Sequence, residues 1–190
     1  KTKRMIMDYK KLFFRLNEKL AQNNLTLHLS CVGGFVLEYY GLKATDDIDA
    51  FYDSSDKIEE LIKEVGIEFG VGTEKEVWLN HAIGNILSLG ASPQRETIYQ
   101  ASHLTVTISS LEEILVDKIE AGRAKDIPDI AKIMKYIGMK TPDLLLKQMK
   151  DYASGETNPA IILEAYSMAY GEEALKNYLR KNPELLRLLR

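Results

Sequence analysis

Two adjacent glycines, Gly33 and Gly34, follow an apolar run and come shortly before a pair of aspartates, Asp47 and Asp49. Side chains two positions apart on a β-strand project from the same face, so the two carboxylates would point together. They would repel each other unless a positive charge lay between them. Mg²⁺ or Mn²⁺, which takes oxygen ligands and accompanies triphosphates, would supply that charge. Because glycine lacks a Cβ atom, Gly33 and Gly34 would let backbone N–H groups approach a phosphate at the start of a helix.

The elements that would position these residues follow from the hydrophobic pattern. Apolar residues recur at helical spacing between Tyr9 and Leu20, and they predict a first helix that ends near Asn23. The segment 77–87 is ambiguous. The remaining predictions, in chain order, are a strand at 25–32, a short helix at 35–41, a strand at 47–52, a helix at 57–65 capped by Ser54-Ser55-Asp56, and a hairpin of strands at 96–101 and 103–109.

This order of elements predicts an α+β fold. The α+β core would cover roughly residues 25–110, and the pattern is helical from Ser110 to the end of the chain. We divide the chain into a first domain over 1–137, which includes the first helix, and a helical extension over 138–190 packed on it. No internal repeat is present.

Composition excludes several classes of protein. With 190 residues and 45% hydrophobic side chains, the chain can bury one core. No apolar run is long enough to span a bilayer, and we expect a cytoplasmic protein without a membrane partner. Cys31 is the single cysteine, and the three histidines lack the spacing of a zinc site. The net charge of -3 argues against binding nucleic acid by bulk charge attraction.

The segments Val32-Gly33-Gly34 and Asp47-Ile48-Asp49-Ala50 together resemble the signature of nucleotidyltransferases of the DNA-polymerase-β superfamily. That signature is an apolar residue, Gly-Gly or Gly-Ser, a short gap, and Asp-apolar-Asp. The resemblance implies a small mixed sheet flanked by helices, and it covers about residues 25–137. Lys43 and Thr45 before the aspartates extend it toward the AbiEii- and MenT-like branch, and the stretch 78–80 is similar to one in uncharacterised relatives.

A second motif of the AbiEii-like branch lies downstream. It places a lysine, an alanine and an arginine before a basic residue and two acidic ones. The corresponding residues here are Lys118, Ala121, Arg123, Lys125, Asp126 and Asp129, with a departure of one residue in the spacing between the alanine and the arginine.

The resemblance implies a role for each candidate residue. Asp47 and Asp49 would hold Mg²⁺ or Mn²⁺, with a nucleoside triphosphate as substrate. Lys118 and Asp126 would complete the catalytic group. The nucleotide-binding residues would be Gly33, Gly34, Lys43, Thr45 and Arg123. The acceptor would be RNA, a protein or a small molecule, and a toxin-like role would bring a cognate antitoxin as a partner.

The helical pattern supports a special role for Lys118 independently. In a helix from Leu111 to Gly122, Lys118 falls within the apolar arc, and a lysine on a buried stripe needs a compensating anion. A substrate phosphate, or the carboxylate of Asp126 or Asp129, would provide it.

Other readings of these residues stay open. The strand at 103–109 carries threonines where many polymerase-β-like enzymes have a third carboxylate, so either Asp126 fills that role or the metal site is incomplete. Gly33-Gly34 would also suit a tight turn, the two aspartates a solvated strand end, and Asp126 a helix cap. Arg123 would also suit a surface charge. The alternative function is a nucleotide-binding or protein-interaction module that retains the fold without turnover.

Overall fold

The computed structural model describes residues 8–73, 76–82, 95–140 and 158–184. The chain forms two compact units, Lys1–Ser110 and Leu111–Arg190, called unit 1 and unit 2 below. This division comes earlier than the predicted boundary after residue 137, because the helices on either side of that position pack against each other within unit 2. Within the described ranges, no helix has the length and apolar character needed to cross a membrane.

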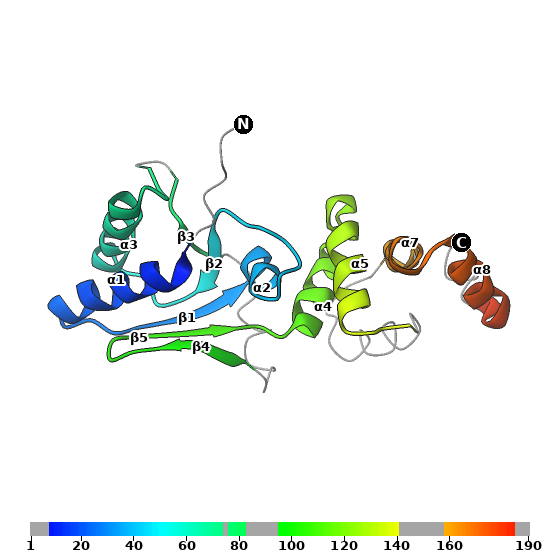
Figure 1. The fold of residues 1–190 in the computed structure, drawn as a ribbon, viewed down its shortest axis with the longest axis horizontal. Helices are drawn as coiled ribbons and strands as arrows, with labels where there is room; N and C mark the ends of the chain where they lie inside the picture. Colours follow the sequence, from blue (N-terminus) through cyan, green and yellow to red (C-terminus); the bar gives the residue numbers. More distant parts are fainter. Residues whose placement is uncertain (1–7, 74–75, 83–94, 141–157, 185–190) are drawn as a thin grey trace. The chain divides into compact units, whose positions relative to one another are not determined.

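Unit 1 is built around a five-stranded mixed sheet with the strand order β3-β2-β1-β5-β4 (Figure 1). The central strand β1 runs parallel to β5 and antiparallel to β2, while β3 runs parallel to β2 and β4 antiparallel to β5. The α+β class with a small mixed sheet is therefore confirmed. The strands are β1 (Leu27–Val32), β2 (Ile48–Phe51), β3 (Leu79–His81), β4 (Glu96–Gln100) and β5 (Leu104–Ile108).

Helices α1 (Tyr9–Gln22) and α3 (Asp56–Phe69) pack together over one face of this sheet (Figure 1). The apolar stripe predicted for the first helix is the buried one, because its leucines and Phe13 turn toward the sheet. A short helix, α2 (Gly34–Tyr39), follows β1 directly, as predicted.

The two faces of β1 differ in character. Leu27, Leu29 and Cys31 are buried on the face that meets the core, whereas the alternate residues are partly or fully exposed. In the cross-strand register, the second face carries Thr107 opposite Ser30 and Asp49 opposite Val32. Asp49 therefore belongs to the more polar face of the sheet.

The edge strand β4 contains a β-bulge. Before it, Glu96 pairs with Ile108; after it, Tyr99 pairs with Val106, and the register shifts between Thr97 and Tyr99. The shift places the ring of Tyr99 on the core side, with its centroid 5.7 Å from that of Phe13.

Helix α3 is longer than the predicted segment 57–65. Ser55 caps it by accepting a hydrogen bond from the backbone N–H of Ile58, and the helix ends at the left-handed Gly70. The sequence suggested a break at Gly66, but this glycine lies inside the helix. A Cβ atom there would come 2.7 Å from Cδ1 of the buried Trp78, whose indole N–H donates to the carbonyl of Ile62.

We predict that Gly66→Ala lowers the free energy of unfolding by about 1–3 kcal/mol, because overpacking against Trp78 outweighs the better helix propensity of alanine. Chemical denaturation measures the change. In a Trp78→Val background, which lacks the Cδ1 atom that makes the close contact, the same substitution should cost clearly less. Equal costs in the two backgrounds would show that Trp78 is not the reason for the glycine.

The described part of unit 2 is helical, as predicted for the C-terminal region. Its α-helices α5 and α7 pack against each other, and a 3₁₀ turn (η2) joins α4 to α5. No side chain of α8 is buried. The elements are α4 (Leu111–Ala121), η2 (Ala124–Asp126), α5 (Ile127–Tyr136), α7 (Pro159–Tyr170) and α8 (Glu172–Lys181).

Candidate functional site

Gly33 forms the junction between β1 and α2, in the position predicted from the sequence. Its φ of 65° and ψ of -137° define a conformation that only glycine adopts without strain. A Cβ atom at Gly33 would lie 3.5 Å from Oδ2 of Asp49. The turn therefore passes close to the carboxylate on the neighbouring strand.

Gly34 lies against the loop that leads into β2. A Cβ atom there would come 3.3 Å from Oγ1 of Thr45. The Thr45 hydroxyl donates to Oδ1 of Asp47 at 3.1 Å, and its backbone N–H donates to Oε2 of Glu38 at 2.9 Å. Gly34 thus leaves room for a threonine that orients Asp47.

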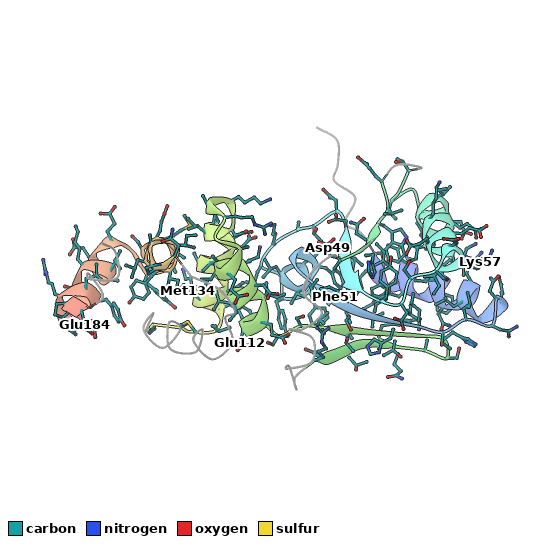
Figure 2. All side chains as sticks on the ribbon, turned by 180° about the vertical axis from the view of Figure 1, so that it is seen from behind. Asp49, Phe51, Lys57, Glu112, Met134 and Glu184 are labelled. Carbon is teal, nitrogen blue, oxygen red and sulfur yellow. The ribbon has the colours of Figure 1, made fainter. Side chains whose placement is uncertain are left out.

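Asp49 lies within β2, and Asp47 immediately precedes that strand. Figure 2 shows Asp49 and Phe51 near each other along β2. Asn80 stands opposite Asp49 on the parallel strand β3, and its side-chain N–H donates to Oδ2 of Asp47 at 3.0 Å. Thr45 and Asn80 thus hold the Asp47 carboxylate from two sides.

The two carboxylates repel each other, as the sequence predicted. Burial raises the pKa of Asp49 above its ordinary value, and the negative charge of Asp47 raises it further. A hydrogen bond from Asn80 acts in the opposite direction but is smaller. The protein therefore holds Asp49 where its negative charge is disfavoured in the absence of a compensating cation.

The donor set fits a magnesium ion that is shared with a substrate. Among the described residues, no group of three or more His, Cys, Asp or Glu side chains could hold a metal. Strand β5 provides Thr105 and Thr107 instead of a third carboxylate. Mg²⁺ is commonly bound by one or two carboxylates together with substrate phosphates and waters, and Asp47 and Asp49 match that mode.

We predict that Asp49→Asn raises the melting temperature of the metal-free protein at pH 7 by less than about 2 °C, because solvent screens part of the repulsion at this half-buried site. Because the folded-state pKa of Asp49 is raised, its charge destabilises the fold only as the pH rises above the unfolded value of 3.8. The difference should therefore vanish toward pH 3. Calorimetry at both pH values tests this.

Asp53→Asn is the matched control, because Asp53 lies just beyond the other end of β2 and is exposed. This control should leave the melting temperature nearly unchanged. A lower melting temperature for Asp49→Asn at pH 7 would contradict the assigned electrostatics.

The downstream motif forms a buried ion cluster in unit 2. Lys118 is 8% exposed, and its Nζ donates to Oδ1 of Asp126 at 2.9 Å and to Oδ2 of Asp129 at 3.0 Å. The sequence required an anion for this lysine and left open whether phosphate or carboxylate would supply it. In the structure both carboxylates do so.

Arg123 adds a second cation to this cluster. Its Nε donates to Oδ2 of Asp126 at 2.6 Å, although its side chain is 53% exposed. Burial alone would raise the pKa of Asp126, but the hydrogen bonds from Lys118 and Arg123 outweigh it and lower that pKa below 3.8. The cluster fixes the η2 turn and the start of α5 to helix α4.

We predict that Lys118→Met lowers the free energy of unfolding by about 3–5 kcal/mol at pH 7, because it leaves Asp126 and Asp129 buried without their shared cation. The stability linked to Asp126 is present above its unfolded pKa of 3.8 and is lost as the pH falls through its lowered value. The cost should therefore shrink at acidic pH. Urea denaturation at several pH values measures it.

The exposed Lys125 in the same segment provides the matched control, and Lys125→Met should change stability by less than about 0.5 kcal/mol. Similar costs for the two variants would show that the ion cluster contributes no special stability.

The predicted site residues thus fall into two groups. Unit 1 brings together Gly33, Gly34, Thr45, Asp47 and Asp49, and unit 2 brings together Lys118, Arg123 and Asp126. Lys43 lies exposed on the loop that also carries Thr45.

The sequence analysis missed two residues that shape the unit 1 site. Asn80 bridges toward both aspartates, but β3 is only three residues long and its register with β2 has no signature in the sequence. Glu38 accepts the backbone N–H of Thr45, and its position on α2 becomes meaningful only once the loop is folded. The resemblance had singled out the stretch 78–80 without assigning Asn80 a role.

A separate hollow lies on α1 and the end of α3, where the rings of Phe14 and Phe69 are exposed. None of the candidate residues lines it. The hollow is therefore separate from the aspartate pair.

Comparisons with known proteins agree with the superfamily suggested by the sequence. Residues 8–170 match the model of a family described as "Nucleotidyltransferase of unknown function (DUF6036)". Among solved structures, the crystal structure of JHP933 from Helicobacter pylori is similar over 100% of both chains, with 15% sequence identity and a TM-score of 0.34. No curated protein matches the chain.

Proposed function

Because this chain belongs to the family described as nucleotidyltransferases of unknown function, we propose that it transfers a nucleoside monophosphate from a nucleoside triphosphate to an acceptor hydroxyl group. The observation that supports this most directly is the pairing of Asp47 and Asp49 beside the Gly33 turn, with the charge of Asp49 disfavoured by burial and by Asp47. Such a pair gains stability from a divalent cation, and a triphosphate brings one.

The reaction exchanges one phosphorus–oxygen bond for another. The acceptor oxygen attacks the α-phosphorus and loses its proton, and the bond to the β-phosphate oxygen breaks, so that pyrophosphate leaves with the electron pair. Mg²⁺ or Mn²⁺ held by Asp47 and Asp49 would stabilise the negative charge on the attacking and leaving oxygens.

The chain's own residues orient these groups. Thr45 and Asn80 hold the Asp47 carboxylate at a fixed angle, so the pair is organised before a ligand arrives. The Gly33-Gly34 turn allows close approach of a phosphate because no side chain covers its backbone. Lys43, on the same loop as Thr45, would add a positive charge for the phosphates.

We assign Lys118, Arg123 and Asp126 a different part. Their charges already pair with one another in unit 2, which supports a structural contribution. The catalytic role of Lys118 and Asp126, and the nucleotide contact of Arg123, are proposals that rest on the resemblance to the AbiEii- and MenT-like branch. A toxin-like role with a cognate antitoxin rests on the same resemblance.

The lack of a third carboxylate on β5 favours one alternative, a nucleotide-binding or protein-interaction module without turnover. Such a module would still bind a nucleoside triphosphate with Mg²⁺ at Asp47 and Asp49 if it retained the first half of the site. Binding and transfer must therefore be measured separately.

We predict that the protein, incubated with Mg²⁺ and nucleoside triphosphates labelled at the α-phosphate, transfers label to a component of total cellular RNA, total protein or small-molecule extract. Asp47→Asn with Asp49→Asn should reduce this transfer at least about 100-fold, because the charges at the reacting phosphate are lost. Gel and thin-layer separation identify the labelled class. Asp53→Asn is the matched control and should retain transfer.

Melting temperatures distinguish the outcomes. A magnesium- and triphosphate-dependent rise that the double variant abolishes, without transfer of label, would favour the non-catalytic module. The same rise in the parent and the double variant would remove the aspartate pair from the proposal altogether.

A further inference from the structure

Arg95 carries a buried side-chain nitrogen that belongs neither to the aspartate site nor to the Lys118 cluster. Within the part of the chain that the structure describes, Nη1 of Arg95 is inaccessible to solvent and has no hydrogen-bond partner. A buried donor without a partner costs free energy, and most such donors in folded proteins are paired. The group therefore needs a reason to be there, and a ligand that completes it would provide one.

The sheet register shows where Arg95 lies. Strand β4 begins at Glu96, which pairs with Ile108 on β5, and Ile108 pairs in turn with Cys31 on β1. These three residues form one row across the sheet. Glu96 turns toward α2, where its carboxylate accepts hydrogen bonds from the hydroxyls of Tyr39 and Tyr40.

The next row contains the aspartate site. One residue beyond Cys31, Val32 pairs with Asp49 of β2. Arg95 precedes Glu96 by one position, so it enters this second row from the β4 side. The alternation of β4, extended by the one residue that precedes the strand, turns Arg95 toward the face that carries Asp49. Three strand spacings of about 4.8 Å separate the backbones of β4 and β2, about 14 Å in all.

The thiol of Cys31 provides a second indication of this arrangement. Burial raises the pKa of Cys31, the guanidinium of Arg95 opposes the rise, and the carboxylate of Asp49 adds to it. Charge interactions weaken with distance, so it is consistent with the sheet register that both charges act on the same thiol. The positive group and the negative pair thus share one end of the sheet.

We propose that Arg95 binds a phosphate group of the nucleoside triphosphate, at the end of the triphosphate that is distant from the aspartate pair. This inference rests on the proposed function and assigns a phosphate-binding residue that the sequence motifs do not contain. A guanidinium offers paired N–H donors that match two phosphate oxygens, and it is a stronger anion ligand when it is desolvated. The carboxylates attract the cation, and Arg95 attracts the phosphates that accompany it.

Titration calorimetry of the full chain tests the assignment with three ligands: magnesium nucleoside triphosphate, magnesium nucleoside monophosphate, and inorganic tripolyphosphate without metal. Arg95→Met should weaken binding of both triphosphates by about ten- to a hundredfold, the effect of losing a charge-assisted hydrogen bond. It should leave binding of the monophosphate within about twofold of the parent, because a monophosphate lacks the terminal phosphate groups. Arg95→Lys should be intermediate, since it keeps the charge and loses the paired donors.

The control is Lys10→Met, which makes the same change in charge at an exposed position on α1. It should leave all three affinities unchanged. The melting temperature of ligand-free Arg95→Met gives an independent readout: it should equal or exceed that of the parent, because an unsatisfied buried donor has been removed. A clearly lower melting temperature would show that Arg95 serves the fold, and it would overturn the proposal.

The outcomes separate this inference from the proposed function. Equal triphosphate affinity in the parent and Arg95→Met overturns the role of Arg95 while leaving the aspartate site intact. If Asp47→Asn with Asp49→Asn leaves magnesium triphosphate binding unchanged, the proposed metal site fails. Loss of tripolyphosphate binding in Arg95→Met would even then support Arg95 as the phosphate ligand.

Discussion

The antiparallel pairing of β1 with β2 is the constraint on which the candidate site depends. The chain leaves β1 through the positive φ of Gly33, and it returns so that Asp49 stands opposite Val32. A side chain at Gly33 would strain this turn beside the carboxylate. The hydrogen bonds of Thr45 then fix where the returning strand begins. The Gly33 turn, the loop that carries Thr45 and strand β2 therefore position the two aspartates together.

The two clusters of candidate residues follow opposite electrostatic rules. In unit 2, two buried carboxylates are neutralised by Lys118, and the pKa of Asp126 is lowered. In unit 1, the carboxylates of Asp47 and Asp49 approach each other beside an amide, and the pKa of Asp49 is raised. The first arrangement is complete within the chain. The second leaves the negative charge of Asp49 disfavoured by burial and by Asp47, and perturbed carboxylates of this kind are common at functional sites.

Local patterns were enough to predict the described helices and strands of unit 1 except β3, whose segment was ambiguous. They also predicted that Lys118 needs an anion, because its place on an apolar helical arc follows from the 100° turn per residue. What they missed depends on contacts between distant segments. Asn80 reaches the aspartates through strand pairing, and Gly66 continues α3 because Trp78 occupies the space of its missing side chain. Arg95 belongs to the same class, since only the sheet register relates it to Asp49.

Because of its bulge, the short edge strand β4 pairs with β5 in two different registers, one before the bulge and one after it. In the register after the bulge, where Tyr99 pairs with Val106, the ring of Tyr99 packs in the core beside Phe13. In the register before the bulge, where Glu96 pairs with Ile108, odd and even positions of the strand face the opposite sides from those after the bulge. Extended by one residue, this register turns the residue that precedes Glu96 to the polar face. A strand without the bulge could place only one of these two residues on its observed face. A single-residue insertion or deletion in this edge strand would therefore reverse which side chains face the core on one side of the change.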